Sequence, residues 1–321
     1  LQKVVIERIS AAGGPMGGAR NPIGYGMCGP AVAAHGTEEQ LRLLRPLFSN
    51  EHIWCQLFSE PGAGSDVASL AMRAERDGDE WIVNGQKVWT TLAHVSSYGL
   101  VICRTDPDLP KHRGITAFIV DMAAPGVEVR PLRQMTGEAE FNEVFFTDTR
   151  IHESEMLGQP GDGWRVSLTT LMNERQSIGG SIPQRGSGTI ANLMKEWADA
   201  PAWKKDDATR DEVMKLWIRA EVLRLTNIRA NNNRKMGDPG PEGSISKMAG
   251  ANLNKDIYEA LVNLMGADAL LYGSYEMVRP EHAMEYATPQ KAFLRSRANS
   301  IEGGTTEVML NILGERVLGL P

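Results

Sequence analysis

Cysteine is scarce in this sequence. Only Cys28, Cys55 and Cys103 occur among 321 residues, and they are widely spaced with no CxxC pair. A small, odd and scattered set argues against a disulfide framework and against a thiolate zinc site, and it is typical of a reducing compartment. We therefore predict three packed, unreactive thiols.

The sequence also lacks long apolar runs and an excess of positive charge. No hydrophobic stretch approaches the length of a membrane span. The 34 basic residues are outnumbered by 40 acidic ones, for a net charge of −6. This balance argues against nucleic acid and anionic membrane as partners. A single acidic metabolite, held by local basic residues, remains compatible with it.

Length and composition allow several domains. With 42% hydrophobic residues and 23% charged residues, a chain of 321 residues can bury a substantial core and hold two or three domains. Three regions differ in pattern: an N-terminal helical region (1–52), a strand-rich region (53–158) and a second helical region (159–321). Because the chain starts at Leu1 within an expected helix over Val4–Ser10, we predict that an N-terminal portion precedes it.

Residues 1–52 are rich in glycine and then helical. Thr37 and Gln40 have the spacing of a capping box, which predicts an amphipathic helix through Phe48. The segment Gly24–Gly29 fits the GxGxxG pattern of dinucleotide-binding loops, but that motif works only between a strand and a helix. Here a proline precedes the segment and another follows it directly. We predict a plain loop at this position.

Short strands separated by Pro, Gly and Asp clusters dominate residues 53–158, which predicts a small antiparallel β-domain. The expected strands are Ile53–Phe58, Gly99–Arg104, Ile115–Asp121, Val127–Pro131 and Glu143–Thr147. From Gly161 onward apolar residues recur three and four apart, as between Val213 and Ile228. Polar breaks near 200–207 and 237–243 divide this region into a predicted helical bundle.

Two segments in the strand-rich region indicate a ligand. In Trp54–Asp66 (WCQLFSEPGAGSD), a strand delivers Ser59 and several turn formers to one edge, where backbone N–H groups and small hydroxyls can face a ligand. In Asn84–Thr91 (NGQKVWTT), the Asn-Gly pair predicts a hairpin turn. Alternation would then place Trp89 and Thr91 on one face, offering a ring and a hydroxyl to a flat polar ligand.

These segments resemble those of the acyl-CoA dehydrogenase family. Asp162–Arg175 (DGWRVSLTTLMNER) resembles the start of the family's first C-terminal helix, and Ser300–Gly314 (SIEGGTTEVMLNILG) resembles its closing flavin-contacting segment. The resemblance implies an α+β fold with a truncated N-terminal helical region, a central antiparallel β-domain and a C-terminal helical bundle. It implies α,β-desaturation of an acyl-CoA thioester by FAD, with electrons passed to an electron-transfer flavoprotein. The acyl group would be a fatty acid or a steroid side chain.

The resemblance also assigns roles to individual residues. The implied cofactor-binding residues are Gln56, Phe58, Ser59, Gly64, Ser65, Trp89, Thr91, Gly304, Thr305 and Glu307, and Ser65 would also lie near the acyl-CoA. Each group has a structural alternative. The turn after Ser59 could simply reverse the chain, and Trp89 could be an ordinary core residue. Thr305 or Thr306 could simply cap the last helix, although a helix N-terminus also suits a cofactor phosphate.

The family's catalytic carboxylate occurs at two alternative places. One place lies just before the Gly-Thr of the last motif, and Gly303 occupies it here. The other lies on the first C-terminal helix directly before an arginine, where this chain has Glu174 followed by Arg175. We therefore predict Glu174 as the catalytic base, with Glu302 as the fallback. Arg175 would help to bind the substrate or fix the base, although an intrahelical ion pair is its alternative.

Two segments that family members lend to a neighbouring subunit are altered. The Arg-x-x-Phe-Gly segment is missing, with Ile190–Lys205 near its place, and the Gly-Gly-x-Gly run is degraded within Asn263–Asp268. The resemblance thus implies a homologous partner subunit, in a dimer or an α2β2 tetramer. An oxidase or monooxygenase, or a non-catalytic subunit of a dehydrogenase, are the alternatives to a dehydrogenase. A bacterial cytoplasmic location is expected, with the mitochondrial matrix as the alternative.

Overall fold

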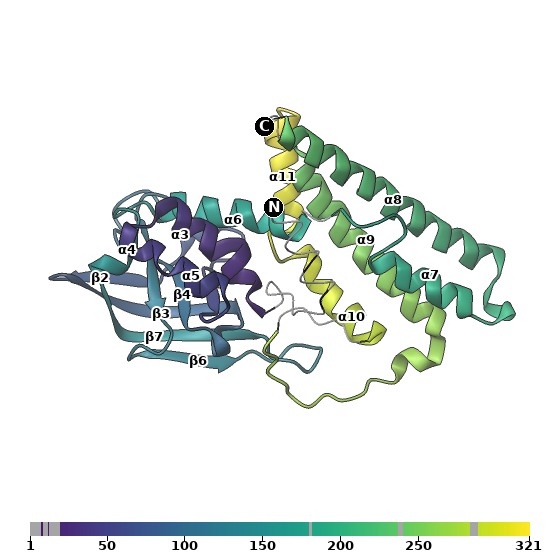
Figure 1. Cartoon of the computed structure of the whole chain (residues 1–321), viewed down its shortest axis with the longest axis horizontal. Coiled ribbons are helices and arrows are strands. Elements are labelled where there is room, and N and C mark those ends of the chain that lie inside the picture. Colours follow the sequence, from purple (N-terminus) through teal and green to yellow (C-terminus); the bar gives the residue numbers. More distant parts are fainter. Residues whose placement is uncertain (1–7, 9–11, 13–19, 180–181, 237–239, 283–287) are drawn as a thin grey trace. The chain divides into compact units, whose positions relative to one another are not determined.

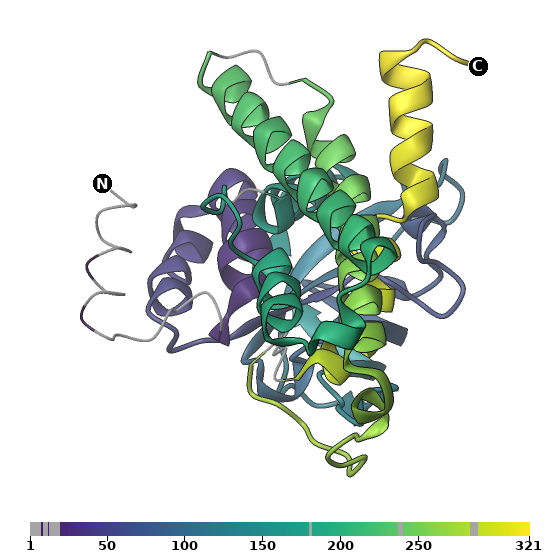
Figure 2. The same cartoon turned by 90° about the vertical axis from the view of Figure 1, so that its right-hand side faces the viewer.

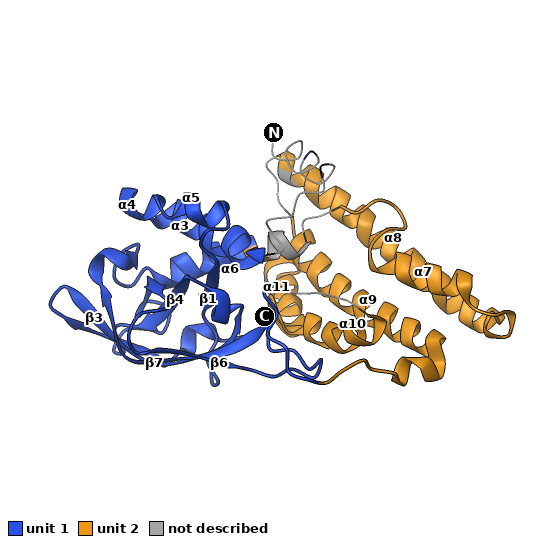
Figure 3. Ribbon diagram, turned by 60° about the horizontal axis from the view of Figure 1, so that its bottom comes forward, with its two compact units in different colours: residues 1–173, 276–285 blue, residues 174–275, 286–321 orange. Residues whose placement is uncertain are grey.

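The computed structural model describes residues 8, 12, 20–179, 182–236, 240–282 and 288–321. It divides into two compact units (Figures 1 and 3): unit 1 holds residues 1–173 and 276–285, and unit 2 holds residues 174–275 and 286–321. One boundary between the two units falls inside helix α6 (Gly163–Gly179), directly before Glu174. The helix predicted at Val4–Ser10 lies outside the described residues.

Unit 1 is built on an eight-stranded sheet (Figure 1) with the order β6-β7-β3-β2-β4-β5-β8, and β1 pairs with β4. The strands are β1 (Trp54–Leu57), β2 (Arg73–Asp77), β3 (Glu80–Thr91), β4 (Tyr98–Arg104), β5 (Ile115–Asp121), β6 (Val127–Pro131), β7 (Phe141–His152) and β8 (Met156–Leu157). Most pairings are antiparallel, which confirms the predicted β-domain. The sheet is nevertheless mixed, because β1 and β2 each pair with β4 in parallel.

Alternating residues of the central strands feed two separate cores. Leu100 and Ile102 of β4 pack with apolar residues of the N-terminal helices, whereas Val101 and Cys103 pack with residues of β3 and β7. Both faces of β4 are therefore buried, which explains its nearly unbroken apolar sequence. Cys28, Cys55 and Cys103 are free and buried in these cores, as predicted. Burial raises the pKa of Cys55 and of Cys103 to about 12.

The segment Gly24–Gly29 is helical, so the predicted loop is wrong. Gly24–Cys28 form a π-helical turn, η1, that continues into α3 (Gly29–His35). Pro30 lies in the first turn of α3, where its missing N–H is tolerated. The buried side chain of Asn21 anchors the entry to this helix, because it donates to two carbonyls and accepts from the amide of Trp54. Pro22 and Ile23, directly before the segment, are helical and not extended, so the rejection of a dinucleotide-binding loop holds.

The predicted capping box is present. Thr37 Oγ1 accepts from the Gln40 amide at 3.3 Å, and Gln40 Oε1 accepts from the Thr37 amide at 3.0 Å. The predicted helix is interrupted, because α4 (Glu38–Leu41) ends before α5 (Leu44–Phe48) begins. Further one-turn helices in unit 1 are η2 (Val67–Ser69), η3 (Ala93–Val95) and η4 (Glu153–Glu155).

The hairpin predicted at Asn84-Gly85 is wrong. Residues 80–91 form one continuous strand, and the chain reverses instead between β2 and β3 at Gly78, which has a φ of 67°. Asn84 exchanges two hydrogen bonds with Asp148 on β7, and the pairing of the two strands shifts between Val83 and Gly85. The Asn-Gly pair thus forms a β-bulge, since a partner strand on the other side satisfies its polar groups.

Unit 2 is helical, as predicted. Its helices are α7 (Thr189–Asp199), α8 (Asp207–Lys235), α9 (Glu242–Met265), α10 (Pro289–Ser296) and α11 (Thr306–Val317), with short segments η5 (Ala202–Lys204), η6 (Gly266–Leu270) and η7 (Arg297–Ser300). Helix α9 is central: α7, α8, α10 and α11 all pack against it (Figures 1 and 2). Within the described part of the chain, no helix is both long and apolar enough to cross a membrane.

Candidate active site

A buried ion pair fixes the turn that follows β1. Lys87 on β3 is fully buried, and its Nζ donates to Glu60 Oε1 at 2.8 Å and to the carbonyl oxygen of Phe58 at 3.0 Å. The Glu60 carboxylate also accepts from the amides of Ala71 at 2.7 Å and Met72 at 3.1 Å. Burial lowers the pKa of Lys87, and the charge of Glu60 opposes this shift. The pair therefore ties together three segments of unit 1.

Trp89 lies at a second β-bulge of β3. The pairing with β7 shifts between Lys87 and Thr90, and Trp89 has a φ of 59°. Positive φ is uncommon for a large side chain and costs on the order of 1–3 kcal/mol. The indole is 58% exposed and makes an edge contact with Phe141, with the ring centres 6.0 Å apart. Trp89 is therefore not a core residue.

The bulge interrupts the strict alternation of β3. Thr90 nevertheless takes the buried position, between the exposed Trp89 and the half-buried Thr91. The shared face of Trp89 and Thr91 stays a prediction. The Val88 amide donates to the Ser59 carbonyl at 2.9 Å, which holds Ser59 beside the bulge. The structure thus brings Ser59 and Trp89 into the same neighbourhood by hydrogen bonding.

Gln56, Phe58 and Ser59 differ in what they offer a ligand. Phe58 is 4% exposed and its side chain packs in the core, so only its backbone is available. Gln56 and Ser59 are half-buried. Neither side chain has a hydrogen-bond partner among the residues that the structure describes, which leaves an amide and a hydroxyl for a bound molecule.

The turn containing Gly64 and Ser65 is open. Both residues are exposed, and a Cβ added at Gly64 would meet nothing within 4 Å. Packing therefore does not explain the glycine, whereas the close approach of a ligand would. An exposed ion pair holds the end of the turn, since Lys111 Nζ lies 2.7 Å from Asp66 Oδ2.

In unit 2, a second turn precedes α11. Gly303 and Gly304 have φ values of 66° and 95°, and Thr305 caps α11 by accepting from the Val308 amide at 3.2 Å. Its predicted capping role is confirmed. The amide of Glu307 and the Thr305 hydroxyl hold the pKa of Glu307 below its ordinary value. The Glu307 carboxylate thus matches the positive end of α11.

The two candidate bases have different surroundings. The Glu302 carboxylate accepts from Arg295 at 2.8 and 3.1 Å, and from Asn299 Nδ2 at 2.7 Å. Arg295 is 5% exposed, so Glu302 belongs to a half-buried ion pair and lies one residue before Gly303. Glu174 is half-buried on α6. The side chain of Arg175 lies outside the described residues.

Sequence reasoning missed three residues that support these turns: Lys87, Glu60 and Lys247. The sequence does contain a signal for Lys87. Trp81 and Val83 occupy alternate, buried positions of β3, and Lys87 lies at a later position of the same alternation. A lysine in such a position requires a buried acidic partner. No comparable signal marks Lys247 on α9, whose ammonium donates to the backbone carbonyls of Asn299 and Gly304.

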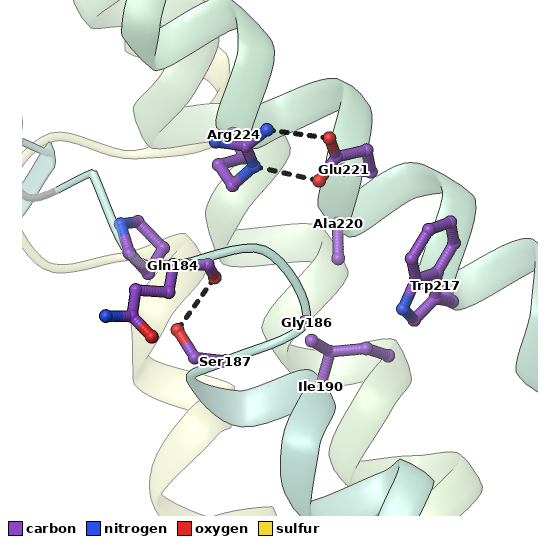
Figure 4. Close-up of a pocket in the computed structure, with 9 residues that line it drawn as sticks. Gln184, Gly186, Ser187, Ile190, Trp217, Ala220, Glu221 and Arg224 are labelled. Carbon is purple, nitrogen blue, oxygen red and sulfur yellow. Dashed lines mark hydrogen bonds and ion pairs between the residues drawn. The ribbon is translucent and has the colours of Figure 1, made fainter.

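A shallow pocket in unit 2 lies apart from the predicted residues. It is bounded by the segment 183–190 and by α8 (Figure 4). Arg224 and Glu221, which line it, form a two-pronged ion pair with both distances 2.8 Å, and the Ser187 hydroxyl donates to the Gln184 carbonyl. Because these polar groups satisfy one another, the pocket is not a candidate active site. Among the described residues, no cluster of three potential metal ligands occurs.

Comparison with known proteins identifies the family. Residues 55–149 match the acyl-CoA dehydrogenase middle domain, and residues 161–318 match the acyl-CoA dehydrogenase C-terminal domain. The chain is 38% identical over 304 residues to acyl-CoA dehydrogenase IpdE1 of Mycobacterium tuberculosis, covering 94% of this chain and 76% of that protein. The chain belongs to the acyl-CoA dehydrogenase family. This confirms the resemblance on which the predictions rest and the assignment of an oxidoreductase.

Solved structures agree with the family assignment. The ChsE4-ChsE5 complex from Mycobacterium tuberculosis superposes with a TM-score of 0.79 at 27% identity, covering 100% of this chain and 82% of that chain. A steroid ACAD named Tcur3481-Tcur3483 superposes with a TM-score of 0.80 at 26% identity, covering 100% and 81%. The predicted α+β fold is therefore confirmed, and the acyl-CoA dehydrogenase family is one of flavoproteins.

Proposed function

We propose that this acyl-CoA dehydrogenase binds FAD, introduces an α,β double bond into an acyl-CoA thioester, and passes the electrons to an electron-transfer flavoprotein. The exposed indole of Trp89 supports this proposal most directly. Its backbone adopts an unfavourable conformation that turns the ring out of the core. Strain of this kind is retained where the exposed group has a function, and an exposed ring suits stacking on a flat cofactor.

The residues of unit 1 fit the edge of a flavin. The Ser59 hydroxyl and the Gln56 amide provide hydrogen-bonding groups to the polar rim of such a ring, and Trp89 provides an apolar face. The open turn at Gly64 and Ser65 leaves space for close approach of cofactor or acyl-CoA. In unit 2, Gly304 and Thr305 would likewise contact a flavin. When bound, the flavin would supply the acceptor for the hydride from the β-carbon.

We assign the catalytic base to Glu174. The reaction needs a carboxylate that removes the α-proton. The Glu302 carboxylate accepts hydrogen bonds from Arg295 and Asn299, so its charge stabilises the turn before α11. Glu174 precedes an arginine on α6, as the family's alternative base does. Arg175 would help to bind the substrate or to orient this base.

The partner proposal rests on the altered segments and on the relatives. The missing Arg-x-x-Phe-Gly segment would leave the cofactor phosphates of a homodimer without a charge-assisted contact. Both solved structures named above carry two protein names. We infer that this chain assembles with a homologous subunit, as an α2β2 tetramer, and that the subunit supplies this contact. The substrate would be a fatty acyl-CoA or the CoA thioester of a steroid side chain.

Substitution of the base tests the function. Glu174→Gln is expected to retain FAD but to slow substrate-driven bleaching of the flavin by about 1,000-fold, the scale for loss of a positioned base. Stopped-flow absorbance without oxygen measures this with a panel of acyl-CoA thioesters. Glu259→Gln serves as the matched control, since Glu259 is an exposed carboxylate on α9.

Three outcomes would contradict parts of the proposal. Normal bleaching in Glu174→Gln with loss in Glu302→Gln would move the base to Glu302. Absence of bound flavin after co-expression with the homologous subunit would indicate a non-catalytic subunit. Rapid turnover with oxygen alone, without an electron-transfer flavoprotein, would indicate an oxidase.

A further inference from the structure

We propose that Lys247 is a positioning residue of the active site: it clamps the turn of residues 300–304 and so fixes Gly304 and Thr305 for the cofactor. Lys247 lies on α9 and is 6% exposed. Its Nζ donates to the Asn299 carbonyl at 3.0 Å and also to the Gly304 carbonyl. This inference rests on the proposed function.

The two carbonyls mark the two ends of the turn. Asn299 lies in η7, the 3-10 segment before the turn, and Gly304 directly precedes Thr305, which caps α11. A single ammonium therefore bridges the entry and the exit of the turn. A buried ammonium is costly unless hydrogen bonds satisfy it, so an apolar residue would be expected at this position if it served packing alone.

The turn needs such a clamp because of its sequence. Gly303 and Gly304 both have positive φ, and consecutive glycines permit many other backbone conformations. Asn254 of α9 adds a second contact, since its Nδ2 donates to Asn299 Oδ1 at 2.6 Å. Arg295 adds a third through Glu302. Lys247 is distinguished from these two because it alone of the three bonds to Gly304 directly.

The ammonium also interacts electrostatically with carboxylates of unit 2. Burial lowers the pKa of Lys247, whereas the charges of Glu302, Glu174 and Glu307 raise it, and Lys255 on the same helix lowers it. Lys247 thus contributes positive charge beside the proposed base, Glu174.

The test compares Lys247→Met with Lys255→Met in the full chain, co-expressed with its partner subunit. Lys255 lies two turns further along α9 and also interacts electrostatically with Glu307, but among the described residues its ammonium does not donate to the turn. In Lys247→Met, amide hydrogen exchange over residues 300–308, measured without FAD, is expected to accelerate at least about 10-fold. FAD affinity is expected to fall by about 10-fold or more, the scale for lost hydrogen bonds to a charged group.

Lys247→Gln is included because its amide can still donate to one carbonyl without a charge. An intermediate effect is expected, and this variant decides the question if Lys247→Met does not fold. Unchanged exchange over residues 300–308 in the folded variants would overturn the proposal. So would equal acceleration throughout unit 2, because it would indicate a general role in stability. If the wild-type complex binds no FAD, the proposed function fails, while the exchange measurement still decides whether Lys247 holds the turn.

Discussion

The buried pair of Lys87 and Glu60 leads to a quantitative prediction for unit 1. Replacement of Lys87 by Met keeps most of the side-chain volume and removes the ammonium. It leaves the Glu60 carboxylate, whose side chain is 8% exposed, with only its two amide hydrogen bonds. The carbonyl of Phe58 loses a donor at 3.0 Å. The perturbation is therefore electrostatic and local.

The expected cost follows from the burial of both partners. Removing one partner of a buried ion pair destabilises a protein by about 3–5 kcal/mol, because the remaining charge is buried without compensation. The Phe58 carbonyl adds about 1 kcal/mol or more as an unsatisfied buried acceptor. We expect Lys87→Met to lower the free energy of unfolding of unit 1 by about 4–6 kcal/mol.

Two controls separate this effect from general damage. Arg150 pairs with Asp77 and Glu80 at the surface of the same sheet, and Arg150→Met should leave stability unchanged within error, since exposed pairs contribute little. Adding Glu60→Gln to Lys87→Met removes the uncompensated charge. The double variant is therefore expected to be more stable than Lys87→Met alone.

Native-state hydrogen exchange is the appropriate assay, because it reports the free energy of opening of particular strands. The slowest amides of β4 and β5 are followed by mass spectrometry in the wild type and the three variants. A loss below about 1 kcal/mol in Lys87→Met, or a double variant less stable than the single one, would refute the reasoning. Either result would mean that water or movement of the chain compensates the buried carboxylate.

Two further predictions concern unit 1. Burial lowers the pKa of His94 below 6.5, so as the pH falls the unfolded chain binds a proton before the folded chain does. The free energy of unfolding should therefore decrease as the pH drops from 6.5 through the lowered pKa. Urea titrations at several pH values should show a weaker pH dependence of stability for His94→Gln than for the wild type, and an equal dependence would contradict the prediction. Gly85→Ala should destabilise by about 1–3 kcal/mol, since Gly85 has a φ of 146° and its added Cβ would lie 2.8 Å from Met72 Cγ. Gly78→Ala, with φ of 67° and open space around it, should cost less in the same urea titration, and equal losses would contradict the clash.

Local patterns predicted much of the fold. The strands Ile115–Asp121 and Val127–Pro131 have the predicted bounds, because apolar runs there end at Gly, Pro and Asp, which cannot continue a strand well. The capping box at Thr37 is likewise local, since its two hydrogen bonds join residues three apart. In these cases the nearest neighbours in sequence determine the conformation.

The errors occurred where distant residues decide the backbone. Asn84-Gly85 has the composition of a hairpin turn, but Asp148, 64 residues away, satisfies the Asn84 side chain and keeps the strand continuous. The bulge at Trp89 likewise depends on the pairing with β7. The clamp by Lys247 acts on backbone carbonyls, which carry no sequence signature. A single sequence does not display such long-range partners.

The burial of the three native cysteines makes the protein well suited to chemical labelling. A thiol that is both inaccessible and protonated does not react with maleimides at neutral pH, and Cys28, Cys55 and Cys103 all meet this description. A cysteine introduced at exposed Glu75 on β2, together with one at exposed Glu212 on α8, would accept a pair of spin labels without removal of any native residue. The distance between the labels, recorded before and after addition of an acyl-CoA, would then report directly on movement between the two units.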